Sequence, residues 1–397
     1  MATRALILAL IALSVGCSCR KETELRPLDT DVPTDGTATG DDDDGTPYDD
    51  ETPGDDAPGD WGQWLSADQA PDGDRLSLAY YDPEREAIGY ALVGFDADGT
   101  PIERHERVDG YSSGDNDVGR YASQLTDVDG TAWVAYHDAD DGLLKVRHRT
   151  GTSEWGAVET VGDGGRWANI GLDADGRLLV AHTADDGVLR VSRRLNNTWQ
   201  TEEVYSSAAT DWATAEGTVV TRPAEVAQPR IHVDGASTYV AFYDKARGEL
   251  HLLSGSYGNF RDELVRGDVD EGAWPSMLSF NNQLFLAYQH VANEDLILAN
   301  RSASGGGGWS HQVVDDGPVV GADTEVFVHD GKVHILYFQG FDSDLYLAVD
   351  DGGWQITRLE GGATAAGFHN ETVEVGGRRW VASYDYTDRG VFFLPLE

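Results

Sequence analysis

Apolar and polar residues alternate with a period of two along much of this chain, most clearly in residues 119–162 (GRYASQLTDVDGTAWVAYHDADDGLLKVRHRTGTSEWGAVETVG). Since successive side chains of a β-strand point to opposite faces, this alternation predicts strands rather than helices. The turn-forming sequences DVDG and DADDG divide the segment, which predicts four strands at 121–126, 131–137, 143–149 and 155–161. A four-stranded sheet alone would leave one face bare and an edge unpaired, so we expect this segment to be one of several copies.

The second strand of that unit recurs along the rest of the chain. Equivalent positions in successive copies are 46 to 60 residues apart. The seven copies are LSLAYYD (76–82), AWVAYHD (132–138), LLVAHTA (178–184), TYVAFYD (238–244), LFLAYQH (284–290), VHILYFQ (333–339) and RWVASYD (379–385). The first strand of most copies opens with Gly-x-aromatic, and the fourth strand usually opens with Trp. Several elements that recur in a fixed order predict a repeat architecture.

Four strands per repeat at this spacing are typical of a β-propeller, in which neighbouring sheets cover one another around a central axis. We therefore predict an all-β, seven-bladed β-propeller of four-stranded blades. The blades are expected near 61–110, 117–162, 165–206, 224–267, 272–316, 321–361 and 366–397. The seventh repeat contains only three strand-like segments. Either its sheet has three strands, or the residues before Trp61 dock there, although their Asp, Pro and Gly content forms strands poorly.

The repeats resemble the sialidase-like, BNR-type propellers of bacterial surface lipoproteins. The resemblance covers residues 61–397 and is carried by the Gly-x-aromatic opening, the AYYD-like second strand and the Trp-led fourth strand. It implies the fold, but one such fold hosts lectins, hydrolases, lyases and scaffolds. Sialidases of this type carry Ser-x-Asp-x-Gly-x-x-Trp turns, an arginine triad and a tyrosine–glutamate pair. DVDGTAW (127–133) lacks the serine, and neither the triad nor the pair can be assigned, which argues against sialidase activity.

The amino terminus has the features of an export signal. A basic residue, Arg4, precedes an apolar run at 5–15 that is too short to cross a bilayer, so we expect residues 1–16 to be a signal peptide. LSVGC (13–17) resembles a bacterial lipoprotein signal, although Ser14 stands where that family prefers Leu. The resemblance implies lipidation of Cys17 and a place in the bacterial cell envelope, at the outer membrane or cell surface. The alternative is a secreted protein.

Residues 17–60 are rich in Asp, Thr, Pro and Gly and include four consecutive aspartates at 41–44. Their like charges repel and few of them can be buried, so we predict a disordered acidic tether. The whole chain has a net charge of -41, which excludes nucleic acid and anionic membrane surfaces as partners. We therefore expect a monomer that contacts a membrane only through its lipid.

The composition leaves little room for a metal or redox centre in the propeller. Both cysteines, Cys17 and Cys19, precede it, so it has no disulfide and no thiolate metal site. Three DxDG sequences at 96–99, 127–130 and 173–176 resemble parts of calcium loops, but Asp and Gly are also the residues that hairpin turns require. We expect turns and no cofactor, with calcium as the alternative.

Propeller geometry brings the openings of the first strands and the ends of the second strands to one face. Aromatic residues beside Asp, Arg and His at these places are suited to sugar recognition, although aromatics that repeat in every blade can instead pack between blades. Positions that break the repeat are better candidates for a site. The predicted ligand-binding residues are His369, Asp323, His182, His290 and Trp212, together with Trp167, Arg166 and Arg120 at the strand openings.

The sequence favours a non-catalytic module that binds a glycan or a protein on this loop-rich face. No GxSxG, HExxH, Walker or dinucleotide-binding sequence is present, and no spacing singles out a carboxylate pair. The alternative is a glycan-active enzyme, either a glycosidase or a polysaccharide lyase. Some seven-bladed lyases of related repeat type use His-Asn on an inner strand, which His369 and Asn370 match, so His369 is a weak catalytic candidate.

Overall fold

The computed structural model describes residues 59–112, 114–213, 218–267, 269–305, 307–360 and 364–396. The predicted signal peptide, the predicted lipid attachment at Cys17 and all but the last two residues of the predicted tether lie outside these residues. The described chain contains β-strands and no helix, as the alternating pattern predicts. These residues therefore contain no helix that is long and apolar enough to cross a membrane.

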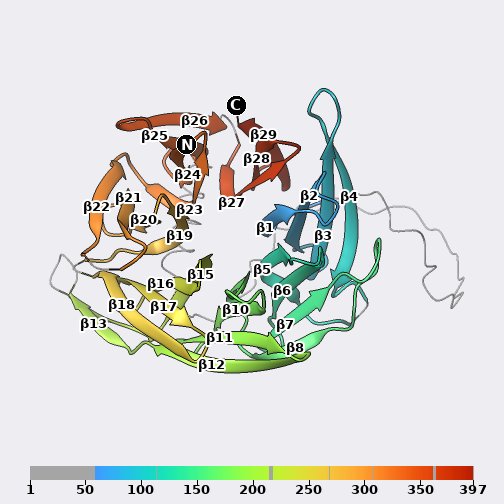
Figure 1. The fold of residues 1–397 in the computed structure, drawn as a ribbon, viewed down its shortest axis with the longest axis horizontal. Helices are drawn as coiled ribbons and strands as arrows, with labels where there is room; N and C mark the ends of the chain where they lie inside the picture. The colour runs from blue at the N-terminus through green and yellow to red at the C-terminus, as the bar shows by residue number, and fades with distance from the viewer. Residues whose placement is uncertain are drawn as a thin grey trace, which may run out of the picture. The chain divides into compact units, whose positions relative to one another are not determined.

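Seven antiparallel sheets lie side by side around a central axis, which confirms the predicted seven-bladed propeller (Figure 1). We number the sheets as blades 1 to 7. Blade 1 contains β1 (Gln63–Gln69), β2 (Leu76–Asp82), β3 (Ala87–Phe95) and β4 (Pro101–Asp109); blade 2 contains β5 (Val118–Thr126), β6 (Ala132–Asp138), β7 (Leu143–His148) and β8 (Glu159–Asp163); blade 3 contains β9 (Arg166–Leu172), β10 (Leu178–Thr183), β11 (Val188–Leu195) and β12 (Thr198–Ser206).

The second half of the ring repeats this order. Blade 4 contains β15 (Val226–Asp234), β16 (Ser237–Asp244), β17 (Glu249–Ser256) and β18 (Asn259–Arg266); blade 5 contains β19 (Ala273–Phe280), β20 (Gln283–His290), β21 (Asp295–Ser302) and β22 (Ser310–Asp315); blade 6 contains β23 (Val320–His329), β24 (Lys332–Gln339), β25 (Asp344–Asp350) and β26 (Trp354–Glu360); blade 7 contains β27 (Ala366–Val375), β28 (Arg378–Asp385) and β29 (Gly390–Leu396). The long connection between blades 3 and 4 forms a separate hairpin of β13 (Thr210–Ala213) and β14 (Val219–Arg222).

The first strand of each blade contacts the first strands of both neighbouring blades, and β1 contacts β27, so the ring is closed. Blade 7 has three strands among the described residues, which is one of the two arrangements that the sequence left open. The backbone N–H of Trp61 donates to the carbonyl of Arg389 in blade 7 at 3.1 Å. The same contact joins blades 1 and 2, where Val118 N–H donates to Glu86 O at 2.9 Å. Residues just before β1 thus join blade 7 without adding a strand to it.

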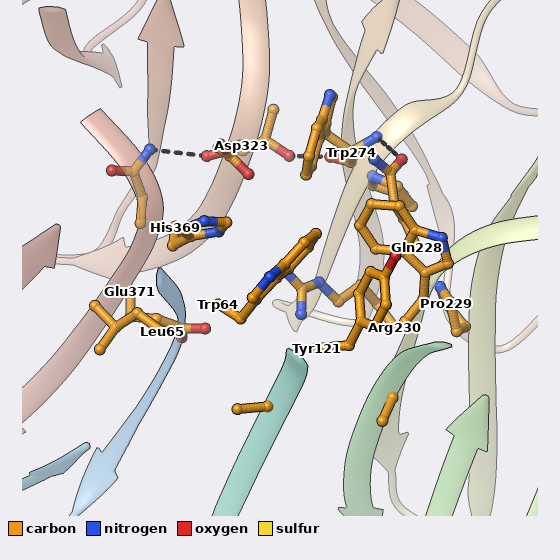
Figure 2. Close-up of a pocket in the computed structure, with 16 residues that line it drawn as sticks. Trp64, Leu65, Tyr121, Gln228, Pro229, Arg230, Trp274, Asp323, His369 and Glu371 are labelled. Atoms are coloured by element: carbon orange, nitrogen blue, oxygen red, sulfur yellow. Dashed lines mark hydrogen bonds between the residues drawn. The ribbon is translucent and has the colours of Figure 1, made fainter. Parts of the chain in front are cut away.

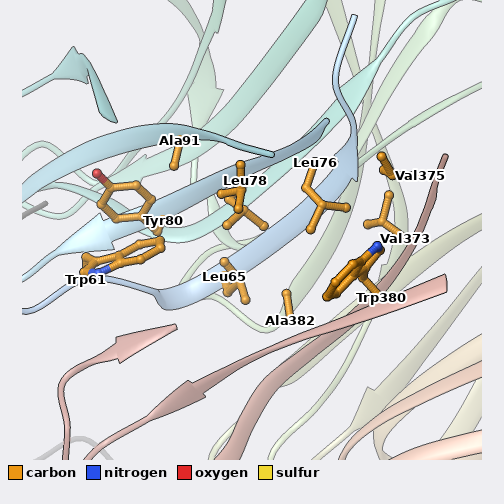
Figure 3. Packing of buried hydrophobic residues seen from close by; sticks show 11 residues of the cluster. Trp61, Leu65, Leu76, Leu78, Tyr80, Ala91, Val373, Val375, Trp380 and Ala382 are labelled. Atoms are coloured by element: carbon orange, nitrogen blue, oxygen red, sulfur yellow. The ribbon is translucent and has the colours of Figure 1, made fainter. Parts of the chain in front are cut away.

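Apolar side chains pack between blades and form the core. At the closure, Leu76 and Leu78 from β2 lie against Val373 and Trp380 of blade 7, and Trp61 packs at the other end of the same cluster (Figure 3). Burying this apolar surface stabilises the closed ring by roughly 25 cal/mol per Å² removed from water. The closure is therefore held by the same kind of packing as the other blade contacts.

The three DxDG sequences are hairpin turns, and their first aspartates cap them. Asp96 Oδ1 accepts the backbone N–H groups of Asp98 and Thr100, both at 2.9 Å. The carboxylates of Asp127 and Asp173 make the equivalent pairs of hydrogen bonds in blades 2 and 3. No group of three or more His, Cys, Asp or Glu side chains in the described part of the chain has an arrangement that would hold a metal ion.

Candidate functional site

One residue near the start of each inner strand has a left-handed backbone conformation. These seven residues, the inner ring, are Trp64, Tyr121, Trp167, Gln228, Trp274, Asp323 and His369, with φ between 48° and 55°. The pairing with the second strand shifts register at each of them, as in a β-bulge. A left-handed conformation costs a non-glycine residue about 1–2 kcal/mol. Such strain often marks functional positions, although its repetition in all seven blades also gives it a structural role.

The inner ring surrounds a cavity of about 60 Å³ on the propeller axis (Figure 2). The lining also includes the residue after each ring position and, in blades 4 and 7, the residue after that, which is Arg230 in blade 4 and Glu371 in blade 7. Sites for small molecules usually have volumes of about 300–1,000 Å³, whereas a water molecule needs about 10–15 Å³ of space for its centre. The cavity therefore holds a few waters or a small chemical group, but not a sugar ring.

The aromatic members of the inner ring contact one another around the axis. The ring centroid of Trp64 lies 4.3 Å from that of Tyr121, 5.2 Å from His369 and 5.3 Å from Trp167. Trp167 also contacts Tyr121 at 4.8 Å and Trp274 at 5.9 Å. These side chains thus form one aromatic cluster in the middle of the propeller. Trp64 also packs against the apolar core between blades 1 and 2, so the cluster contributes to packing between blades as well.

Polar members of the ring are held by hydrogen bonds to the next blade. Gln228 Oε1 accepts the backbone N–H of Trp274 at 2.6 Å. The carboxylate of Asp323 accepts the backbone N–H of His369, and Asn370 Nδ2 donates to the backbone carbonyl of Asp323 at 2.9 Å. Each polar side chain therefore bridges two blades and is fixed at the edge of the cavity.

The residues two positions after the ring members divide into two kinds. In four blades a short polar side chain accepts a backbone N–H from the next blade. These acceptors are Ser66, Ser123, Asn169 and Ser276, at 2.7 to 3.0 Å from the donors Gln124, Ile170, Ile231 and Val326. The other three blades place Arg230, Glu325 and Glu371 at this position. Arg230 acts on the pKa of both Glu325 and Glu371, and Glu325 acts on that of Glu371, so the three residues that break the repeat lie close to one another.

The surroundings shift the charge states of these groups. Burial raises the pKa of Asp323 to about 7, and the His369 N–H and Arg230 oppose this only partly. Burial likewise raises the pKa of Glu325, and the pKa of Glu371 rises through burial and through repulsion by Glu325. Burial and nearby Arg230 lower the pKa of His369 to about 3, so its imidazole is neutral at pH 7. The axis therefore carries three carboxyl groups that ionise reluctantly, with Arg230 near all three and Arg379 near Glu325.

The structure brings together three of the residues predicted from the sequence: His369, Asp323 and Trp167 all line the cavity. The other five do not. His182 is fully buried in blade 3, where Nε2 lies 2.9 Å from Ser192 Oγ. Trp212 lies on β13 and donates from Nε1 to Ala246 O at 2.6 Å.

The remaining three predicted residues lie on strands outside the cavity lining: His290 ends β20, Arg120 lies on β5 and Arg166 begins β9. His290 Nδ1 accepts the backbone N–H of Asn293 at 3.1 Å, Arg120 pairs with Asp117 at 2.7 Å, and Arg166 pairs with Asp185. Among the predicted residues that depart from the repeat, only those on an inner strand therefore line the cavity.

Sequence reasoning missed Arg230, Glu325 and Glu371. The signal was present two residues beyond the aromatic opening, where four copies have Ser or Asn and three have a charged residue. The Gly-x-aromatic opening that identifies the repeat ends at the ring position, so it does not include the charged position two residues later. Gln228, which stands where most copies have an aromatic residue, also lines the cavity.

No model of a known protein family matches the chain, and no curated protein is similar to it in sequence. Solved structures are similar in shape at low identity. Hydrazine synthase from Kuenenia stuttgartiensis is 11% identical, with a TM-score of 0.55 and coverage of 89% of this chain and 99% of that chain. The Aleuria aurantia lectin in complex with Fucα1-6GlcNAc is 12% identical (TM-score 0.44; 69% and 94% covered), and the SapL1 lectin in complex with α-methyl fucoside is 12% identical (TM-score 0.46; 76% and 96% covered). At these identities the similarity concerns the fold alone, which is a β-propeller.

Proposed function

We propose that this protein is a non-catalytic binding module that recognises a glycan at the inner ring, on the face where the first strands open. One observation carries the proposal: the axis ends in a cluster of aromatic rings edged by polar side chains that bridge neighbouring blades. Aromatic faces stack on the apolar faces of sugars, and fixed polar groups bind hydroxyls. The Nε1 of Trp274 is buried without a hydrogen-bond partner in the described residues and is a donor available to such a ligand after a small movement.

The geometry supports binding better than hydrolysis. A glycosidase must place its scissile bond between two carboxyl groups, which requires room for a sugar ring at the acids. Glu371 instead lines a cavity of about 60 Å³ that is too small for a ring, and Glu325 lies close to it. The raised pKa values of Asp323 and Glu325 are the one feature that favours the alternative of a glycan-active enzyme, because perturbed carboxyl groups cluster at active sites.

We also propose that the propeller is displayed on the bacterial cell envelope by a lipid on Cys17, through the acidic segment 17–60. The apolar run at 5–15 and the LSVGC sequence support this. Mass spectrometry of the mature protein tests it, since a lipid mass on Cys17 is expected. Cleavage elsewhere or an unmodified cysteine would indicate a secreted protein instead. Binding is proposed to need no cofactor, so chelation with EDTA should leave the affinity unchanged.

A glycan array followed by calorimetry on the full chain tests the function. Trp64→Ala and Trp167→Ala should each weaken binding of the selected glycan at least tenfold, since each removes a ring face. Trp199→Ala is the matched control: Trp199 lies on the outer strand β12, and its Nε1 donates to Glu159 at 2.8 Å. It should leave binding unchanged. Absence of any bound glycan would overturn the proposal and leave a protein partner as the alternative, whereas release of reducing ends or unsaturated uronate would identify an enzyme.

A further inference from the structure

The cavity beneath the aromatic cluster has a charge pattern that neutral sugars do not need. Two carboxyl groups line it, from Asp323 and Glu371, and Arg230 is the cation in the lining. The carboxyl group of Glu325 lies close enough to raise the pKa of Glu371. His369 contributes no positive charge at neutral pH. Asp68 on β1 adds a further negative charge close enough to affect Glu371. The site therefore has an excess of negative groups when its carboxyl groups are ionised.

Direct contacts within the described part of the protein do not neutralise these charges. Within the described residues, the side chains of Glu325, Glu371 and Arg230 take part in no hydrogen bond or salt bridge, so the carboxylates act on one another and on Arg230 only at longer range. By contrast, buried Glu106 is paired with Arg149 at 2.6 Å, and buried Asp344 with Arg358 at 3.0 Å. Unpaired carboxylates beside a small cavity provide acceptors for a cation.

We propose that the glycan bound at the inner ring carries a free ammonium group, as a deacetylated amino sugar does, and that this group enters the cavity between the aromatic cluster and Glu371, with Glu325 close by. The inference rests on the proposed function and specifies its ligand. Ammonium groups are attracted to aromatic faces, most strongly to Trp, and Trp64, Trp167, Trp274 and Tyr121 surround the cavity. An ammonium group beside Glu371 lowers the pKa of that carboxyl group, so its entry favours the ionised form, which then supplies the counter-charge.

Size and charge together select this class of ligand. A cavity of about 60 Å³ accepts an ammonium group and a few atoms while the sugar ring stays outside, against the aromatic cluster. An N-acetyl group is larger, carries no charge and directs a carbonyl oxygen toward the carboxylates. A uronate or sialate would bring its own carboxylate to Glu325 and Glu371, which repel it more than the single Arg230 attracts it. Neutral and acidic sugars are thus both disfavoured in the cavity.

Titration calorimetry with the glucosamine disaccharide and its N,N′-diacetyl form tests the proposal on the full chain at pH 7.5. Sodium chloride at 0.3 M is included because the net charge of -41 attracts any cation weakly, and salt screens that attraction. The deacetylated disaccharide is expected to bind at least tenfold more tightly. Equal affinity, or tighter binding of the acetylated form, would overturn the ammonium inference and leave the glycan-binding function standing; binding of neither would overturn both.

A pair of double variants locates the effect. Glu325→Gln with Glu371→Gln removes two charges from the cavity and should abolish the preference for the deacetylated form. Asp316→Asn with Asp388→Asn removes two exposed charges from loops at the same face, after β22 and after β28, and should retain it. Circular dichroism checks folding of each. If the control lowered the preference as much as the cavity variant, general surface charge would be the cause and the proposed site would be wrong.

Discussion

The hydroxyl of Tyr384 donates a 2.6 Å hydrogen bond to the carboxylate of Asp60, which precedes it by 324 positions in the chain. Asp60 lies four residues before the inner-ring position of blade 1, and the contact recurs at two other blade junctions. Tyr81 donates to Asp117 at 3.0 Å, and Tyr243 donates to Asp270 at 2.5 Å, each aspartate again four residues before a ring position. The junction that closes the propeller therefore repeats the contacts that join consecutive blades.

This contact predicts the stability of the closure. Tyr384→Phe keeps the ring but leaves the buried Asp60 carboxylate without its donor, which should lower the free energy of unfolding by about 1–3 kcal/mol. Tyr81→Phe is the comparison inside the chain and should cost less, since Asp117 keeps its ion pair with Arg120 at 2.7 Å. Urea unfolding measures both. An unchanged midpoint for Tyr384→Phe would show that packing alone closes the ring.

The glycines that open the inner strands predict a second effect on stability. Gly119 has a φ of 113°, and a Cβ atom there would lie 2.9 Å from the backbone Cα of Ile88 in the preceding blade. Gly119→Ala should therefore destabilise the fold by more than the conformational cost of about 1–2 kcal/mol. Gly176→Ala also has a positive φ, 75°, but meets no atom within 4 Å and should show that conformational cost alone. Equal losses measured in urea would mean that the blades separate to admit the methyl group.

These glycines explain why the fold was predictable from the sequence. Gly119 and its equivalents are required by a close approach between blades and recur in six of the seven copies, Val226 being the exception. The second strands are buried on both faces, so their apolar pattern recurs in the copies. The cavity was harder to predict, because it is formed by residues that avoid the repeat. Arg230 and Glu371 are 141 positions apart (371 − 230), and only closure of the ring brings them to one cavity.

The raised pKa of Asp323 predicts a dependence of stability on pH. A carboxyl group with a pKa of about 7 in the folded protein, and near 3.9 when unfolded, binds its proton more tightly in the folded state. Its contribution to stability is complete below about pH 4 and is lost as pH rises through 7. Asp323→Asn retains an oxygen that accepts the His369 N–H but cannot ionise. It should be more stable than the unmodified protein at pH 8 by about 1–3 kcal/mol, a range reduced from the full shift because the cavity admits water.

Thermal or urea unfolding from pH 4 to pH 8 checks this, and the two proteins should converge at pH 4. Asp316→Asn, in the exposed loop just before β23, is the control and should show no such gain. The pKa values of Glu325 and Glu371 are raised as well. The stability of the variant should therefore still depend on pH, but less strongly than that of the unmodified protein. Lower stability of Asp323→Asn at pH 8 would mean that the carboxylate is compensated in the folded state, contrary to its raised pKa.

Trp212 is predicted to stabilise the fold and not to bind the ligand, although its place in the long connection made it a candidate from the sequence. Its Nε1 donates to Ala246 O at 2.6 Å, and the Arg222 guanidinium lies 4.1 Å from the centroid of its ring. Arg222 in turn pairs with Asp270 at 2.7 Å, the same carboxylate that accepts from Tyr243. The β13–β14 hairpin is thus tied by Trp212 and Arg222 to the junction between blades 4 and 5.

Trp212→Ala removes both contacts of the indole and should lower the free energy of unfolding by about 2–4 kcal/mol, while the affinity for the glycan selected on the array changes less than twofold. Trp64→Ala should behave in the opposite way, because its ring is partly exposed at the cavity and makes no interblade hydrogen bond in the described structure. Urea unfolding and calorimetry on the two variants separate the roles. Lost affinity in a folded Trp212→Ala protein would extend the binding site from the axis to the β13–β14 hairpin.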